Sequence, residues 1–468
     1  MRTILYTVLF VFCIVHLVGC KKFIDVNSDP NNPLTVQEAL ILAPVELNLS
    51  SVLTGANGTG GNAAMYVNHF MQNVAVNQPV PNEGTYRLFS VDFDDAWKNI
   101  YVTSLNNLKV MNDKATANGN YNYSGIGKIL SAFFLGIATD YWGDVPYTDA
   151  FGGSTKLQPA YDSQEGIYKT IQQLIDDGIA DINKNATITP GGDDYFYGGD
   201  MDQWKRFAYT LKARYYMHLT KAPGYTALAQ ANLVLSALQN GMTSNDDDMK
   251  MGYTGGAGQE NPWYIDFLPV STLVLSSACV DTLVTRNDPR LPKLIAKAKQ
   301  TGLYNGRPIG SINISGSLNV YSLPGTAYGA AGSPLYVFNY SEALFLKAEA
   351  TLIKSGSAAA EPIYQDAIKS HMSRLGIASG DVDNYIAARG TLTAANALQR
   401  IMEEKKIANF LSIENFNDWR RTGFPLLTKV PNASSEIPRR LLYPQVEILS
   451  NPQGVQTAKL TDRVWWDK

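Results

Sequence analysis

Cysteine and histidine are scarce in this chain of 468 residues, which holds three Cys and four His. Cys13 lies within an apolar leader and Cys20 directly after it, so Cys279 is the one cysteine of the body. A single cysteine can form neither an intrachain disulfide nor a cysteine metal cluster. The HExxH, GxSxG and P-loop motifs are absent, as is any close pair of histidines. We therefore expect neither a metal ion nor a cofactor, and we expect Cys279 to be a small buried side chain.

Charged residues are also few, at 17% of the chain against about 25% in ordinary globular proteins. The net charge is -3, and the 39 Lys and Arg residues are scattered along the sequence. A nucleic-acid partner is therefore not expected, because phosphate backbones are bound by concentrated basic surfaces. Gly and Pro occur at ordinary frequencies, which excludes a collagenous or low-complexity chain.

A single apolar run of 15 residues, Ile4 to Val18, follows Arg2, and it is shorter than the roughly 20 residues that span a bilayer. Such a run is typical of a secretion signal. It ends in Leu-Val-Gly-Cys, which resembles the bacterial lipobox, whose cysteine carries lipid and becomes the mature N-terminus. We therefore expect a signal peptide over residues 1–19, a lipidated Cys20 that opens a tether over residues 20–33, and a single body over residues 34–468.

Helical periodicity dominates this body, most clearly over residues 164–184, where isoleucine and leucine recur on one face. Similar patterns predict helices over residues 93–115, 124–141, 202–220, 226–239, 341–354, 362–375 and 394–411. Several are consecutive with short connections, so we expect a mostly α fold of antiparallel helix pairs of tetratricopeptide type, with minor β structure. Residues 252–339 are rich in Gly, Ser, Pro and Tyr and predict a loop-rich side.

Five segments carry recognisable motifs: TDYWGDVPYTDA at residues 139–150, YGGDMDQWKRFAYTLKAR at 197–214, NDPRL at 287–291, YSEA with KAEA at 340–350, and RRLLYPQVE at 439–447 with the closing residues 462–467. Together with the lipobox, and in this order, they resemble the signatures of the SusD/RagB family of outer-membrane nutrient-binding lipoproteins. Tyr209 and Thr210 depart from the family's usual Asn-Ser, which indicates a divergent branch.

This resemblance implies a SusD-like fold whose loop-rich face lies opposite the helix pairs. It implies a surface-exposed lipoprotein on the outer membrane of a Gram-negative cell, with a SusC-like TonB-dependent transporter as its partner. It further implies non-catalytic binding of nutrient oligosaccharides and their delivery to that transporter. An oligopeptide ligand is the alternative, because some members bind peptides, and a surface glycoside hydrolase is a less favoured one.

Sugar ligands present flat apolar faces that aromatic rings cover, and hydroxyl edges that polar side chains meet. The resemblance places such groups on the middle region and on an early loop. The candidate ligand-binding residues are Trp263, Tyr264, Tyr304, Tyr321, Tyr328 and Arg307 in the middle region, and Asn73, Asn77, Asn82 and Tyr86 in the early loop. Trp263 follows Asn-Pro, so we expect a loop side chain free for ligand, whereas Trp97 lies on a helical stripe and is expected in the core.

A glycosidase would need two facing carboxylates. Four acidic residues beside the motifs are candidates for that role: Asp144, Asp149, Glu342 and Glu349. Single acidic residues near helix ends commonly cap helices or form ion pairs, so we expect a scaffold role for them. The run Asp246–Asp248 lacks the spacing of an EF-hand calcium loop and predicts a solvated turn.

Overall fold

The computed structural model describes residues 37–55, 62–454 and 457–468, and the predicted signal peptide, Cys20 and tether lie outside them. Its α-helices are α2 (Ala39–Thr54), α3 (Ala63–Phe70), α4 (Asp94–Lys98), α5 (Asn106–Asn118), α6 (Tyr121–Trp142), α7 (Gln164–Ile182), α8 (Met201–His218), α9 (Ala227–Ala237), α10 (Pro262–Asp266), α11 (Ser277–Thr285), α12 (Leu291–Leu294), α13 (Tyr340–Ser355), α14 (Ser357–Arg374), α15 (Ser379–Arg389), α16 (Ala397–Ala408), α17 (Glu414–Thr422) and α18 (Gln445–Ser450).

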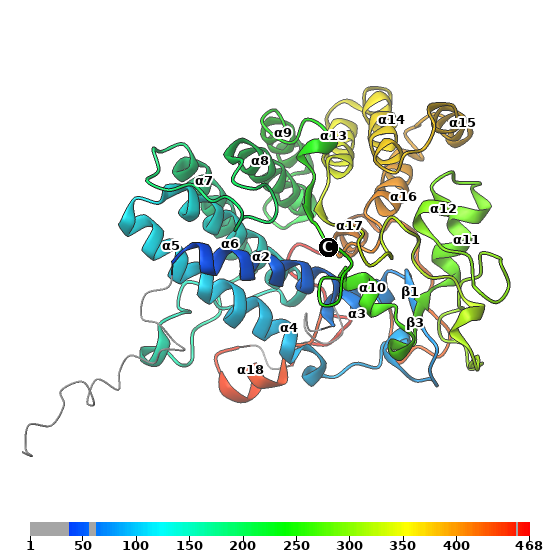
Figure 1. Ribbon diagram of the computed structural model, residues 1–468, viewed down its shortest axis with the longest axis horizontal. Coiled ribbons are helices and arrows are strands. Elements are labelled where there is room, and N and C mark those ends of the chain that lie inside the picture. The colour runs from blue at the N-terminus through cyan, green and yellow to red at the C-terminus, as the bar shows by residue number, and fades with distance from the viewer. Residues whose placement is uncertain (1–36, 56–61, 455–456) are drawn as a thin grey trace, which may run out of the picture.

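Helices α5 to α9 and α13 to α15 form an arc, in which α6 packs on α7, α8 on α9 and α13 on α14 (Figure 1). The predicted mostly helical fold is confirmed, and each predicted helix is present. The helix expected over residues 93–115 consists of α4, a π-helical segment at Asn99–Leu105, and α5. The tetratricopeptide type of the pairs stays a prediction.

Helices α6 and α7 approach each other closely because each carries a glycine where they cross. A Cβ atom on Gly125 would lie 2.6 Å from Ile182 Cγ1, and one on Gly178 would lie 2.9 Å from the carbonyl oxygen of Gly125. On the predicted apolar face of α7, Ile167, Ile171 and Ile175 are fully buried, and Leu174 is partly buried. Helix α6 is buried along almost its whole length, as its apolar sequence predicts.

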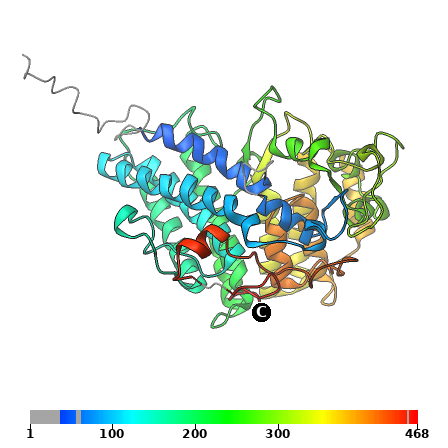
Figure 2. The same cartoon turned by 90° about the horizontal axis from the view of Figure 1, so that it is seen from below.

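Two short antiparallel ladders connect the loop-rich region to the helices. β1 (Val74–Val76) pairs with β3 (Leu273–Leu275), and β2 (Met249–Met251) pairs with β4 (Leu335–Phe338). Figure 2 shows the loops of the middle region gathered at the end of the molecule that lies away from α5. The early loop and the middle region, which are about 200 residues apart in the chain, therefore lie next to each other.

Candidate functional site

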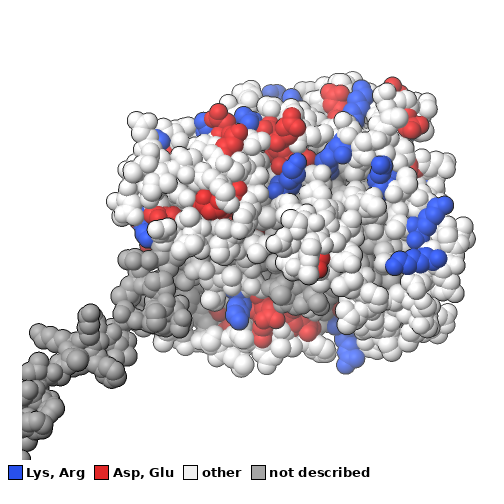
Figure 3. Space-filling model, in the orientation of Figure 1, with Lys and Arg blue, Asp and Glu red and all other residues white. Residues whose placement is uncertain are grey.

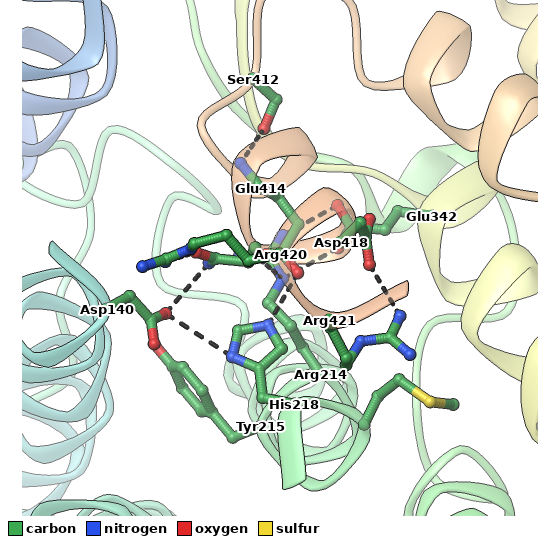
Figure 4. Close-up of polar contacts among 12 residues, drawn as sticks. Asp140, Arg214, Tyr215, His218, Glu342, Ser412, Glu414, Asp418, Arg420 and Arg421 are labelled. Atoms are coloured by element: carbon green, nitrogen blue, oxygen red, sulfur yellow. Dashed lines mark hydrogen bonds and ion pairs between the residues drawn. The ribbon is translucent and has the colours of Figure 1, made fainter. Parts of the chain in front are cut away.

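A buried polar network lies where α6, α8 and α17 meet (Figure 4). His218 Nε2 lies 2.8 Å from Glu414 Oε1, and the Tyr168 hydroxyl donates to Asp140 Oδ1 at 2.5 Å. Burial opposes ionisation of Glu414, yet His218 beside it lowers the pKa of that carboxyl below its usual range. The cavity beside these groups measures about 10 Å³, room for roughly one water molecule, so the network has no space for a substrate.

The acidic side chains weighed above as glycosidase carboxylates each have a partner within the scaffold: Glu342 with Arg214, Glu349 with Arg421, Asp144 with the N–H of Gln164, and Asp149 with Lys156. Glu342 and Glu349 are almost completely buried. The expectation that these residues pair within the scaffold is confirmed by these contacts.

The acidic run at Asp246–Asp248 differs from its prediction, because a solvated turn was expected and only Asp246 is exposed. Asp247 accepts a hydrogen bond from Arg206 Nε at 2.8 Å, and Asp248 accepts one from the N–H of Tyr340 at 2.7 Å. The run thus holds β2 against the start of α13. Within the described part of the chain, no three His, Cys, Asp or Glu side chains gather in an arrangement that could hold a metal ion.

A cleft of about 290 Å³ opens in the loop-rich region, between α10, the segment that follows α12 and residues 318–329. Tyr264, Phe267 and Tyr321 supply aromatic surface to it, and Lys297 and Lys299 supply cations. Among the described residues that line it there is no carboxylate. We call this feature the aromatic cleft.

Helix α10 positions the first of these rings. The Asn261 side chain accepts the N–H of Trp263 at 2.8 Å, and Pro262 occupies the first helical position, where its missing N–H costs nothing. Asn261 Nδ2 also donates to the Ser333 carbonyl at 2.9 Å, which fixes the start of α10 to the neighbouring loop. The capped helix turns Tyr264 into the aromatic cleft and Trp263 into the core.

The prediction that Trp263 is a free loop side chain is wrong. Trp263 is only 2% exposed and belongs to the main apolar core, where its ring lies 6.1 Å from that of Phe267. The physical reason is the short helix that Asn261 and Pro262 initiate, since one face of a helix beside the core must be buried. Trp97, in contrast, is 6% exposed and stacks on Tyr101 at 4.4 Å, as predicted.

Three of the candidate binding residues lie at the aromatic cleft. Tyr264 and Tyr321 line it, and the ring of Tyr304 lies 5.6 Å from Lys297 Nζ. The Tyr321 hydroxyl accepts a hydrogen bond from Arg307 Nη1 at 3.0 Å, which orients the ring at the cleft wall. The role of these side chains in binding ligand stays a prediction.

Arg307 and Asn77 hold the loops together instead of facing the cleft. Arg307 is 2% exposed, and its guanidinium donates to the carbonyl of Val76 at 2.8 Å and to that of Asn313 at 2.8 Å. Asn77 pairs with the backbone of Ser315 through both its amide nitrogen, at 2.8 Å, and its amide oxygen, at 3.0 Å. These contacts join the early loop to the middle region.

The remaining candidates are occupied by local structure. Tyr86 and Tyr328 are buried in the core, at 2% and 4% exposure. Asn82 caps its own turn, where its N–H donates to the Thr85 hydroxyl at 2.8 Å. Asn73 donates to Asn68 Oδ1 at 2.8 Å and lines a different cavity.

The sequence reasoning did not single out Lys297 and Lys299. A signal was present, because residues 289–341 contain five Lys and Arg and no Asp or Glu. Figure 3 shows basic side chains and few acidic ones on the surface over α11 and α12. A cleft with aromatic faces and cations but without a carboxylate can hold a polar ligand, and it lacks the acid and base that hydrolysis of a glycosidic bond needs.

Similarity to known proteins defines a binding protein rather than an enzyme. A SusD-like family described as starch-binding and associating with the outer membrane matches residues 30–444, and the chain belongs to this family. A chitin-binding protein of known structure is 25% identical, with a TM-score of 0.80 over 92% of this chain and 100% of that one. A SusD/RagB family protein from Bacteroides thetaiotaomicron is also 25% identical, with a TM-score of 0.79 over 92% and 99%.

A chitin-binding SusD homologue from Flavobacterium johnsoniae shares the fold, with 22% identity and a TM-score of 0.78 over 92% of this chain and 98% of that one. No curated protein matches the chain. None of the described helices is long and apolar enough to cross a membrane. The family and the fold thus agree with the non-catalytic, mostly helical protein predicted from the sequence.

Proposed function

We propose that the protein binds nutrient oligosaccharides in the aromatic cleft and delivers them to a SusC-like TonB-dependent transporter at the cell surface. The observation that carries this proposal is the cleft lining, where Tyr264 and Tyr321 offer ring faces for sugars and Lys297 and Lys299 offer donors for hydroxyl groups. The chitin-binding relatives support a glycan as the ligand. Lipid on Cys20 would anchor the single body of residues 34–468 through its tether.

The binding step is tested with Tyr264→Ala. After an array of oligosaccharides and peptides has identified a ligand, calorimetry should show binding weakened roughly ten-fold, since one stacked ring contributes on the order of 1 kcal/mol. The melting temperature should change little, because Tyr264 is only partly buried. Tyr195→Ala is the matched control, since Tyr195 is 49% exposed and lies away from the cleft. Binding of peptides instead of glycans, or equal affinities of the two variants, would contradict the proposal.

The anchor and the partner are tested in cells. Cys20→Ala should release the protein from the membrane fraction, because the acyl chains of a bacterial lipoprotein provide the attachment. The unmodified protein should co-purify with a TonB-dependent transporter under gentle detergent extraction. Recovery of the protein alone, together with unchanged nutrient uptake after deletion of that transporter, would contradict the delivery step.

A further inference from the structure

A second cavity, of about 210 Å³, lies between α11 and α16 and shares no lining residue with the aromatic cleft. One wall is apolar and consists of Leu283, Ile407, Phe410 and Leu411. Leu426 stands at the rim, where it is 75% exposed. This volume suits a single small molecule. We call this feature the α11–α16 cavity.

The opposite wall carries two cations. Lys406 Nζ donates to the Met71 carbonyl at 2.9 Å, and no carboxylate of the described residues forms an ion pair with it. Arg286 Nη2 lies 2.7 Å from Glu403 Oε2, and its Nη1 lies 3.6 Å from Glu404 Oε1, an ion pair without a hydrogen bond. Burial, and to a smaller degree the nearby Arg286, lowers the pKa of Lys406 to about 8. An anion held between the two cations would therefore stabilise both.

The one carboxylate in the lining does not supply that anion. Glu403 Oε2 accepts from Arg286 at 2.7 Å and from Arg389 at 2.8 Å, and Glu403 Oε1 accepts from Gln399 at 2.8 Å. The carboxylate is therefore already held by three donors, and it forms no ion pair with Lys406. The lining keeps an excess of one positive charge, which favours a ligand with a single negative charge.

Two side-chain carbonyls add acceptors to this wall. Asn73 uses its amide nitrogen toward Asn68, and Gln399 uses its own toward Glu403. No described donor reaches the amide oxygen of Asn73 or that of Gln399, so each is available to an N–H of a ligand. Cys279 contributes only a neutral thiol, because burial raises its pKa to about 11.

We propose that the α11–α16 cavity is a second ligand site, which takes an apolar amino-acid residue with a free carboxylate and an acylated nitrogen. The carboxylate lies at Lys406 and Arg286, the amide N–H donates to Gln399 or Asn73, and the apolar side chain packs on the wall that includes Leu283. This chemistry is an apolar side chain, a carboxylate and an amide N–H on one small molecule. A free N-acyl amino acid and the C-terminal residue of a peptide both carry it.

The experiment measures binding to the full-length protein in detergent by calorimetry. N-acetyl-leucine should bind, and N-acetyl-leucinamide, which lacks the carboxylate, should bind at least about ten-fold more weakly. An Ala-Ala-Leu peptide separates the two sources: tighter binding than N-acetyl-leucine assigns the site to peptide C-termini, and weaker binding assigns it to free N-acyl amino acids. Equal binding of the acid and the amide, or of neither, would overturn the proposal.

Two variants test whether N-acetyl-leucine binds in the α11–α16 cavity. Lys406→Met should weaken N-acetyl-leucine binding about ten-fold, the loss of one charge-assisted hydrogen bond. Should that variant melt at a lower temperature, Leu426→Glu at the exposed rim gives the same test through repulsion of the carboxylate. Leu449→Glu is its matched control, since Leu449 is 77% exposed on α18. Equal effects of Leu426→Glu and Leu449→Glu on N-acetyl-leucine binding would overturn the assignment. Tyr264→Ala should leave N-acetyl-leucine binding unchanged even where glycan binding is lost.

Discussion

Arg214 on α8 and Lys405 on α16 keep 5% and 1% of their side chains exposed, whereas Lys297 and Lys299 on the loop-rich face stand in solvent. The buried cations have close partners: Arg214 donates to Glu342 at 2.8 Å, and Lys405 lies 2.7 Å from an oxygen of Asp418. The exposed lysines occupy a segment that contains no acidic residue. The buried charges of the helices therefore fix geometry, while Lys297 and Lys299 stay available to a ligand.

The same division separates the family signature from the ligand site. Each of the recognised segments contributes side chains to the buried scaffold: Asp140, Trp204, Arg290, Glu342 and Trp466. Tyr264 and the lysines of the aromatic cleft lie outside those segments. Similarity to the family thus predicts the fold and the binding role, and the identity of the ligand depends on residues outside these segments.

The largest effect is expected from Glu342→Ala in the arc. Removal of the carboxylate leaves Arg214 and Lys405 buried, and Lys405 lies 3.8 Å from Glu342 in addition to its contact with Asp418. Breaking a buried pair from one side costs about 3–5 kcal/mol of unfolding free energy, because an uncompensated charge stays in the interior. Denaturant unfolding measures this loss. A cost below about 1 kcal/mol would show that the buried charges do not stabilise the arc.

A comparable loss is expected from Trp263→Ala, although Trp263 belongs to the loop-rich region. Its ring is fully enclosed beside Phe267, and truncation of a buried Trp costs about 3–5 kcal/mol. Trp97→Ala in the arc is the matched control and should cost about as much. Thermal unfolding of both variants gives the comparison, and an unchanged melting temperature for Trp263→Ala alone would place this side chain outside the core.

The longer helices were predictable because their apolar residues recur at helical spacing in the sequence. Isoleucines at helical spacing located α7, and the nearly continuous apolar run located α6. The sequence pattern did not predict five other helices, namely α2, α3, α11, α15 and α17. Their burial depends on contacts between distant segments, as for Asn68 on α3, whose amide donates to the carbonyl of Leu411 at 3.0 Å.

The site was predictable only in part, since no local pattern states which loop side chains are free. The clustering of aromatic residues in the middle region pointed to Tyr264 and Tyr321. The guanidinium of Arg307, in contrast, donates its hydrogen bonds to the carbonyls of Val76, which is distant in the sequence, and of Asn313, six residues further on. The Asn-Pro pair before Trp263 is a helix-start signal, and it could have predicted that this ring is buried. Pairing across more than 200 residues is not visible in a single sequence.

An effect that depends on pH is expected from Glu46→Gln. Glu46 on α2 is fully buried, and burial together with the neighbouring Asp194 raises its pKa from 4.5 to about 10. The folded protein therefore keeps a proton that the unfolded chain releases above about pH 4.5. Stability contributed by this group falls as the pH rises from about 4.5 toward 10, at about 1.4 kcal/mol per pH unit.

Glu46→Gln removes this dependence while it keeps an acceptor for the N–H of Tyr195, which lies 2.6 Å from Glu46 Oε2. The variant should gain stability relative to the unmodified protein as the pH is raised from 5.5 to 8, measured by denaturant unfolding at each pH. A constant difference between the two proteins over that range would contradict the raised pKa. The pH dependence of stability thus distinguishes Glu46, a buried carboxyl without a cationic partner, from the buried ion pairs such as Glu342 with Arg214.

The smallest effect is expected from Asp113→Ala on the outer surface of α5. Asp113 pairs with Lys109 one turn earlier at 2.6 Å, but the two side chains are 67% and 48% exposed. Water and salt screen such a pair, so its loss should change the unfolding free energy by about 0.5 kcal/mol or less. Glu342→Ala and Asp113→Ala each delete one carboxylate from an ion pair, and both are measured by the same denaturant titration. Their ratio isolates the contribution of burial, and a loss above about 1 kcal/mol for Asp113→Ala would mean that pairing alone stabilises the arc.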